Sequence, residues 1–277
     1  MSATAKSRSA GPVGRLLIGL ALLGATLCVG VPVALIFSFA FREGIDAYAA
    51  NILAPDTLHA IWLTVLTALV VLPINIGFGI SAAWLVTRHD FPGRQVLMTI
   101  IELPFSISPI VAGVAYLFLY GGQGLFGPAL EAGGIRLMFT VFAIFLVSLF
   151  VTAPFVAREL IPVMQQQGGD DEEAALSLGA NGWQMFRLVT LPNIRWPLLY
   201  GAILCNARVM GEFGGVSVVA GAIRGQTNTL PLQISLLFND FNVVGAFAAA
   251  SVLTLLALMT IVVKYALERM EGTDRHG

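Results

Sequence analysis

Three ionisable residues interrupt long apolar stretches of the sequence: Glu102, Arg208 and Glu212. Arg208 and Glu212 are four residues apart, so a helix would place them on one face, where they can pair. A charge within a membrane-spanning helix is costly, and such residues are by default functional candidates. Two interpretations follow. Arg208 attracts an anion that Glu212 holds or gates, or the two residues form a structural ion pair between helices.

Hydroxyl and amide side chains near prolines and glycines in the same stretches can hold a dianion through hydrogen bonds. The candidates are Ser106, Ser108, Asn206 and Ser217. Helical hydroxyls also bond to their own backbone, which is the simpler explanation of each. We therefore treat these four residues, with Glu102, Arg208 and Glu212, as a candidate pathway for an anion.

Enzymatic chemistry has little support in the sequence. Glu102 and Glu212 could act as an acid and base pair, but no nucleophile with a partnered base is visible. No G-x-x-x-x-G-K-[ST] phosphate loop occurs, so energy from ATP must come from another chain. Cys28 and Cys205 lie in apolar runs without metal-ligand spacing. We expect neither a catalytic residue nor a metal or other cofactor.

The elements that position these residues are membrane helices. The sequence has 277 residues, of which 57% are hydrophobic and 11% charged, a composition typical of a chain surrounded by lipid. Six apolar runs are long enough, or nearly so, to cross a bilayer as helices. They are residues 16–41, 60–86, 96–120, 138–156, 197–219 and 243–265. The first run exceeds the apolar core of a signal peptide, so we interpret it as a retained helix.

The distribution of Lys and Arg predicts the orientation, since short loops rich in these residues stay in the cytoplasm. One side collects Lys6, Arg8, Arg15, Arg88, Arg94, Arg158, Arg187, Arg195, Lys264, Arg269 and Arg275, and the other holds Arg42, Arg136 and Arg224. Both termini and the segment 158–196 are therefore predicted to be cytoplasmic. The sequence has no stripe of basic residues, so it does not indicate nucleic acid as a partner.

The most informative stretch of that cytoplasmic segment is residues 170–192. Four acidic residues, 170–173, suit the positive end of a first short helix, and Gly179 and Gly182 permit a turn. A second short helix follows, which Pro192 is expected to end. Trp183, Phe186 and Val189 recur at helical spacing in it. An exposed apolar face of this kind favours docking of a partner, although an amphipathic hairpin lying on the membrane is the alternative.

This stretch resembles the EAA loop of ABC importer permeases, which runs E-A-A, three residues, G, nine residues, I, one residue, L-P. Glu173, Ala174, Ala175, Gly179, Leu191 and Pro192 match, and Val189 replaces the Ile. In that family the loop forms a coupling helix that docks on the ATP-binding subunit. The resemblance implies an all-α MetI-like permease fold with six transmembrane helices, and it makes these residues, with Trp183 and Phe186, the contacts to the ATPase.

A narrower resemblance concerns the cargo. Residues 206–214, Asn-Ala-Arg-Val-Met-Gly-Glu-Phe-Gly, are similar to a fifth-span motif of permeases for tetrahedral oxyanions. Residues 217–232 are similar to sulfate/thiosulfate permeases of the CysW type, although Ala222 stands where that type has His. The resemblance implies sulfate or thiosulfate as cargo, with molybdate or another oxyanion as the alternative.

The resemblance also implies the partners and the organisation of the chain. We expect two copies of an ATP-binding subunit, a second related permease, an extracytoplasmic sulfate-binding protein and the lipid bilayer of a bacterial inner membrane. Residues 1–15 and 266–277 would be cytoplasmic tails, and residues 16–265 the permease domain. An ion-driven carrier using Glu102 and Glu212 is a further alternative, which the absence of an evident internal repeat disfavours.

Overall fold

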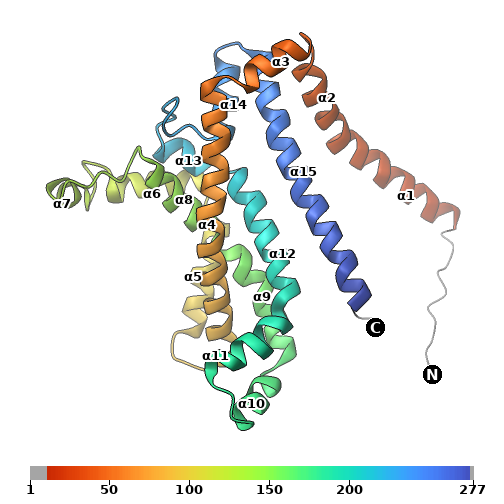
Figure 1. Ribbon diagram of the computed structural model, residues 1–277, viewed down its shortest axis with the longest axis vertical. Coiled ribbons are helices and arrows are strands. Elements are labelled where there is room, and N and C mark those ends of the chain that lie inside the picture. Colours follow the sequence, from red (N-terminus) through yellow and green to blue (C-terminus); the bar gives the residue numbers. More distant parts are fainter. Residues whose placement is uncertain (1–10, 275–277) are drawn as a thin grey trace.

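The computed structural model describes residues 11–274, and every regular element among them is helical (Figure 1). The predicted all-α fold is confirmed for this part of the chain. Lys6, Arg8 and Arg275, used above to predict orientation, lie outside it. The elements are α1 (Pro12–Ala25), η1 (Thr26–Gly30), α2 (Val31–Ala40), α3 (Ile45–Ile52), α4 (Pro55–Arg88), α5 (Arg94–Ser106), α6 (Pro109–Tyr120), α7 (Gly127–Ala132), α8 (Val141–Thr152), α9 (Pro154–Gln167), α10 (Asp170–Ser177), α11 (Gly182–Met185), η2 (Phe186–Thr190), α12 (Leu191–Met210), α13 (Gly214–Val219), α14 (Leu230–Asn239) and α15 (Val243–Asp274); η1 and η2 are π-helical turns.

Five helical stretches are long and apolar enough to cross a membrane. They are Val13–Ala40, Pro55–Arg88, Val141–Gln167, Gly182–Met210 and Val243–Ala266. A sixth candidate is the pair α5 and α6, whose axes differ by 109°. The six-helix prediction therefore holds only if this bent pair counts as one span.

The third predicted span, residues 96–120, contains a sharp corner between α5 and α6. Ile107 and Ser108 leave the helical region, with ψ angles of 132° and 133°, and Ser108 directly precedes Pro109. The proline ring disfavours the helical conformation of the preceding residue, which explains the break. The run 96–120 is largely apolar on both sides of this corner, so its composition alone does not reveal the corner.

The fifth predicted span, residues 197–219, is wrong at both ends. The helix already begins at Gly182 and ends at Met210, and the turn 211–213 separates it from α13. The expectation that Pro192 ends a short helix is also wrong, because α11, η2 and α12 form one continuous rod through Pro192. The wide π-helical turn just before Pro192 is the kind of adjustment by which a membrane helix tolerates a proline.

The centre of the bundle is the packing of α9 between α4 and α12. Gly79 of α4 and Gly201 of α12 both face Val156 of α9. A Cβ atom added at Gly79 would lie 2.6 Å from Val156 Cβ, and one at Gly201 would lie 2.9 Å from Val156 Cα. Small residues at these crossings let membrane helices approach closely, which fixes the three rods relative to one another.

The first helical stretch stands apart from this centre. None of its most apolar 18-residue window is buried, and α2 reaches the rest of the chain along α15, where the rings of Phe39 and Phe247 stack at 5.0 Å. Figure 1 shows α1 and α2 diverging from α15 toward the N-terminus. Helix α15 itself continues to Asp274, beyond the predicted end of its apolar run at residue 265.

Candidate functional site

Helices α10 and α11 form a hairpin, residues 170–192, at one end of the bundle (Figure 1), and α3 and α14 lie at the opposite end. All four acidic residues fall in the first turn of α10, where the helix dipole stabilises negative charge. Gly179 ends α10 with a φ of +90°, and the N–H of Ala180 donates to the carbonyl of Ala175 at 3.1 Å. This left-handed cap requires a glycine, so the predicted break at Gly179 is confirmed.

The second arm of the hairpin begins with a capping box. Asn181 Oδ1 accepts from the N–H of Gln184, and Gln184 Oε1 accepts from the N–H of Asn181, both at 2.9 Å. Gly182 is the first helical residue rather than part of the turn. The spacing Asn-x-x-Gln is a helix-start signal that our sequence analysis overlooked.

The outer surface of the hairpin carries the residues that match the EAA pattern. Glu173, Ala174, Gly179, Trp183 and Pro192 are exposed, and Ala175, Phe186, Val189 and Leu191 are half-buried. The rings of Trp183 and Phe186 stack with centroids 5.8 Å apart, as their helical spacing predicts. Large apolar side chains that the sequence analysis missed join them: Leu178 is 90% exposed and Leu188 is 70% exposed.

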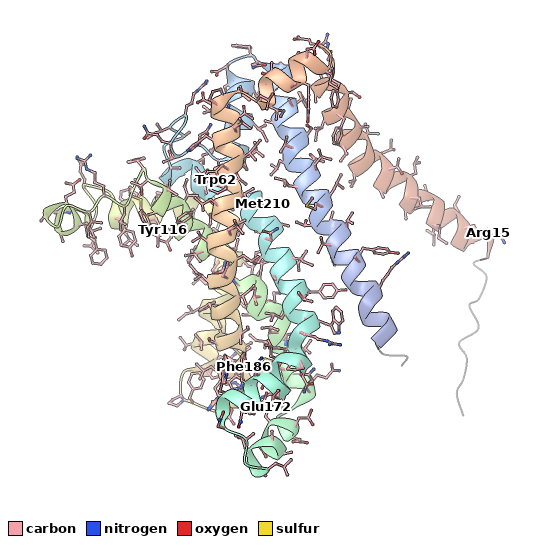
Figure 2. All side chains as sticks on the ribbon, viewed as in Figure 1. Arg15, Trp62, Tyr116, Glu172, Phe186 and Met210 are labelled. Carbon is pink, nitrogen blue, oxygen red and sulfur yellow. The ribbon has the colours of Figure 1, made fainter. Side chains whose placement is uncertain are left out.

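One member of the acidic cluster behaves differently from its neighbours. Glu172 is buried, and its carboxylate pairs with Arg88 at the end of α4, with Nε and Oε2 2.8 Å apart. Figure 2 shows Glu172 and Phe186 at the hairpin end of the bundle. In the sequence, nothing local distinguishes Glu172 from the other three acidic residues of the cluster.

The second region of interest is a paired break, residues 107–113 and 211–215, where the corner between α5 and α6 meets the corner between α12 and α13. A Cβ atom added at Gly113 would lie 2.8 Å from the Gly215 carbonyl oxygen, and one added at Gly214 would lie 3.3 Å from Pro109 Cβ. The two interrupted helices thus meet backbone to backbone at glycines.

Glu212 lies within the paired break, and Arg208 lies in the last turn of α12 beside it. Their predicted pairing is confirmed, with Arg208 Nη1 2.5 Å from Glu212 Oε2. The other oxygen, Oε1, accepts from the N–H of Gly215 at 2.9 Å. The pair joins the last turn of α12 to the turn that follows, so the interpretation as an ion pair between separate spans is wrong. Glu212 is 2% exposed, whereas the Arg208 side chain is 32% exposed.

Of the other predicted pathway residues, Ser108 lies within the paired break and Ser217 bonds to it. Ser217 Oγ donates to the carbonyl of Gly214 at 2.8 Å, the self-satisfied state of a helical hydroxyl. Asn206 Nδ2 donates to Met210 Sδ at 3.6 Å, and Ser106 and Ser108 are exposed at the corner between α5 and α6.

Glu102 belongs to another part of the bundle. It lines a cavity of about 280 Å³ between α5 and α9, together with Phe105 and Arg158, whose guanidinium stacks on the Phe105 ring at 4.9 Å. Neither Arg208 nor Glu212 lines this cavity. The structure therefore separates Glu102 from the pair with which it was grouped.

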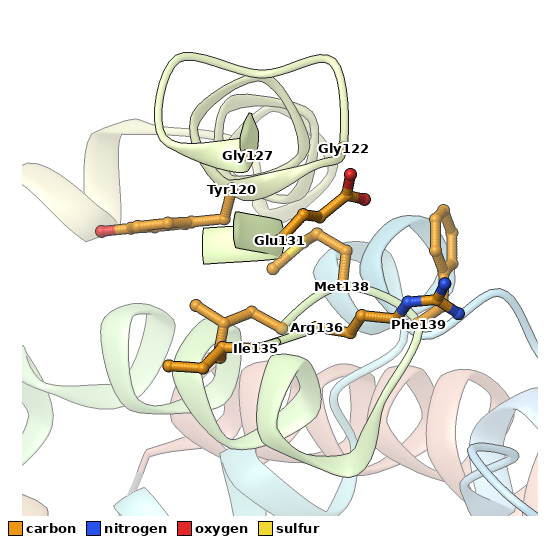
Figure 3. A pocket seen from close by; sticks show the side chains of 9 residues that line it. Tyr120, Gly122, Gly127, Glu131, Ile135, Arg136, Met138 and Phe139 are labelled. Atoms are coloured by element: carbon orange, nitrogen blue, oxygen red, sulfur yellow. The ribbon is translucent and has the colours of Figure 1, made fainter. Parts of the chain in front are cut away.

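A further cavity, of about 220 Å³, lies beneath α7 (Figure 3). Its lining includes Tyr120, Glu131, Arg136 and Phe139 but none of the predicted pathway residues. A Cβ atom at Gly122 would lie 2.8 Å from Glu131 Oε1, so the carboxylate lies against the loop backbone. This wall holds a carboxylate and a guanidinium, as the region around the paired break does. The paired break remains the better candidate because it lies in the stretch 206–214 that resembles permeases for oxyanions. Among residues 11–274, no cluster of three His, Cys, Asp or Glu side chains could hold a metal ion.

The comparison with known families assigns the class. The chain belongs to the family described as the binding-protein-dependent transport system inner membrane component, whose model matches residues 75–272. The matched residues contain both the hairpin and the paired break.

The similarity to individual proteins is narrower. The chain is 53% identical over 260 residues to the sulfate transport system permease protein CysW of Escherichia coli (strain K12), which covers 94% of this chain and 89% of that protein. It is 47% identical over 262 residues to sulfate permease 2, chloroplastic, of Chlamydomonas reinhardtii, covering 95% of this chain and 71% of that protein. The sulfate transport system permease protein CysT of Escherichia coli (strain K12) is 33% identical over 255 residues, covering 92% of each chain.

Among solved structures, a chain of a bacterial alginate ABC transporter in complex with its alginate pentasaccharide-bound periplasmic protein superposes with a TM-score of 0.73. The superposition covers 92% of this chain and 93% of that chain at 18% sequence identity. At this identity the likeness establishes the fold, and the predicted fold of an ABC importer permease is confirmed.

Proposed function

We propose that this chain is the permease subunit of an ATP-driven importer for sulfate and thiosulfate. The observation that carries the cargo is the 53% identity, over 94% of the chain, with a protein named as a sulfate transport system permease. The residues on either side of Arg208 and Glu212 are the ones that resemble oxyanion permeases. Sulfate is a dianion, and a partly exposed guanidinium is a group that binds such anions strongly.

In this proposal the chain has no ATPase activity, and ATP is hydrolysed by two copies of a separate subunit. A second, related permease completes the pathway, and an extracytoplasmic binding protein delivers sulfate. The protein lies in a bacterial inner membrane with both termini and the hairpin in the cytoplasm, as the distribution of Lys and Arg indicates.

The hairpin is the proposed contact to the ATPase. Leu178 and Trp183 are 90% and 69% exposed on the solvent side of a small helical element. Large exposed apolar side chains of this kind mark an interaction surface. Ala174 and Ala175, with the glycine cap beside them, allow a partner backbone to approach closely. Closure of the ATPases on ATP would move the hairpin and open the spans outward, and hydrolysis would reset them.

The paired break is the proposed gate of the pathway. Glu212 is buried and holds Arg208 and the N–H of Gly215 at the same time. An arriving sulfate would compete with Glu212 for the Arg208 guanidinium. The same guanidinium would therefore serve both the anion and the gate. Ser106, Ser108, Asn206 and Ser217 are proposed to line the approach, and Glu102 with Arg158 the opposite side of the corner.

The test is uptake of labelled sulfate by a permease-deletion strain that expresses this chain with its companion subunits. Thiosulfate and selenate are expected to compete, and ATP depletion is expected to stop uptake. If molybdate alone competes, the cargo is another oxyanion and the class survives. Uptake by the purified chain alone, driven by an ion gradient, would instead favour a secondary carrier.

A further inference from the structure

Helix α10 is a short element with a glycine hinge at each end. It spans eight residues, too few to be stable as an isolated helix in water. Gly168, before it, has a φ of +71°, and Gly179, after it, has a φ of +90°. A Cβ atom at either glycine would meet nothing within 4 Å. The covalent chain alone therefore allows α10 to swivel relative to the bundle.

Glu172 holds α10 against the bundle through an ion pair and hydrogen bonds. Its Oε2 accepts from Arg88 Nε at 2.8 Å, and its Oε1 accepts from Arg88 Nη2 at 3.3 Å and from Thr190 Oγ1 at 2.9 Å. The third guanidinium nitrogen, Arg88 Nη1, donates to the carbonyl of Met164 at 2.9 Å. The Glu172 carboxylate thus joins α10 to the end of α4 and to the π-helical turn η2, and Arg88 extends the contact to the end of α9.

These contacts are protected from solvent. The Arg88 and Glu172 side chains are 12% and 10% exposed, and Thr190 is 2% exposed. A two-pronged guanidinium–carboxylate contact fixes orientation as well as distance. Other polar contacts of the hairpin lie at its surface, such as Asn193 Nδ2 donating to Asp171 Oδ2 at 3.3 Å. Water competes for the latter kind, so the buried cluster is the stiffer connection.

The cluster also connects the hairpin to the paired break. Thr190 belongs to the rod formed by α11, η2 and α12, which runs from Gly182 to Met210, and Arg208 lies in its last turn. At about 1.5 Å per residue, the part of the rod from Thr190 to Arg208 carries a displacement over about 27 Å. Figure 2 shows Glu172 near one end of the rod and Met210 at the other.

We propose that Arg88 and Glu172 are positioning residues that transmit movement of α10 to α4, α9 and α12 and so couple the ATPases to the gate. The proposal rests on the proposed function of the hairpin. Glu172 is not part of the exposed surface offered to the ATPase. Loss of the Glu172 carboxylate should therefore leave docking of the ATPase intact but stop movement of the hairpin from reaching the paired break.

The experiment uses the complete transporter, reconstituted in vesicles with its ATPase subunits, companion permease and binding protein. The variant Glu172→Gln keeps the size of the side chain but places an amide donor among donors. Asp90→Asn is the matched control, because Asp90 pairs with Arg94 at 2.7 Å near the end of α4 while remaining 95% exposed. Readouts are co-purification of the ATPase subunit, basal ATP hydrolysis, its stimulation by sulfate-loaded binding protein, and uptake.

For Glu172→Gln we expect wild-type co-purification and basal hydrolysis, with stimulation and uptake reduced about tenfold. Asp90→Asn should match the wild type in every readout. Normal stimulation and uptake by Glu172→Gln would overturn the inference. Loss of the ATPase subunit from the complex would also overturn it, since Glu172 would then be a docking residue.

A double variant, Arg88→Met with Glu172→Met, covers the case in which Glu172→Gln fails to fold. It leaves no buried unpaired charge, and apolar replacement of a buried pair is commonly tolerated. We expect a folded, assembled and uncoupled transporter, and coupled uptake by this variant would contradict the inference. If the wild-type transporter itself shows no ATP-driven sulfate uptake, it is the proposed function that fails.

Discussion

The hairpin and the paired break use glycine in opposite ways. In the hairpin, Gly179 supplies a positive φ and has open space around it, so the chain turns and the surface stays free. In the paired break, Gly113 and Gly215 are buried and let two backbones touch. The hairpin therefore leaves its surface open, as the proposed docking of a second protein requires. The paired break is built to hold two parts of the same chain together until something separates them.

The largest effect is expected from Gly179→Val, which tests the hairpin's dependence on its cap. A β-branched residue at a φ of +90° costs about 1–3 kcal/mol locally and would redirect α10. Sulfate uptake and co-purification of the ATPase subunit should fall to background, while the amount of chain in the membrane stays normal. Glu173→Arg, on the exposed face, should give the same result.

Gly179→Asn is the matched control for that change, because Asn tolerates left-handed conformations better than other side chains. It should retain most uptake. Normal uptake by both Gly179→Val and Glu173→Arg would remove the basis for assigning the hairpin to coupling.

A second test separates the two interpretations of Arg208 and Glu212. Removing Arg208 leaves the buried Glu212 carboxylate unpaired, which costs about 3–5 kcal/mol, so Arg208→Gln alone should lower the amount of folded chain. The double variant Arg208→Gln with Glu212→Gln avoids this cost and should reach the membrane normally. If the pair serves the pathway, uptake by the double variant falls about tenfold. Wild-type uptake would mean that the pair is purely structural.

The smallest effect concerns single methyl groups and contrasts the regions directly. Gly113→Ala places a Cβ atom 2.8 Å from the Gly215 carbonyl and should lower the free energy of unfolding by about 1–3 kcal/mol. Gly182→Ala, in the hairpin, meets nothing within 4 Å and should be neutral. Thermal unfolding of the two purified variants in detergent measures the difference. Equal melting temperatures would contradict the close approach at the paired break.

The sequence was sufficient for features set by local chemistry. The helical class, the turn at Gly179 and the pairing of Arg208 with Glu212 follow from composition, from the demands of a left-handed residue and from four-residue spacing. Largely apolar composition concealed the corner at Ser108, although its cause, Pro109, is visible in the sequence. The passage of the rod through Pro192 depends on the π-helical turn, which no simple pattern predicts.

The burial of Glu172 was out of reach for a different reason. Its neighbours Asp170, Asp171 and Glu173 are exposed and look the same in sequence. Only the folded bundle brings Arg88, from the far end of α4, next to one of them. Contacts between distant segments are set by helix packing. Only the structure can therefore distinguish an exposed acidic residue that is free to contact a partner from a buried one that holds α10 against the bundle.

The most direct test of the account is thiol labelling of the hairpin in the assembled transporter. Leu178→Cys is introduced into a background in which Cys28 is Ala and Cys205 is Ser, and Leu125→Cys, 74% exposed near α7, is the control. We expect Leu178→Cys to react rapidly in the isolated chain and to be shielded once the ATPase subunits bind, whereas Leu125→Cys should be unaffected by them. Equal labelling of Leu178→Cys in the isolated chain and in an actively transporting complex would contradict this expectation.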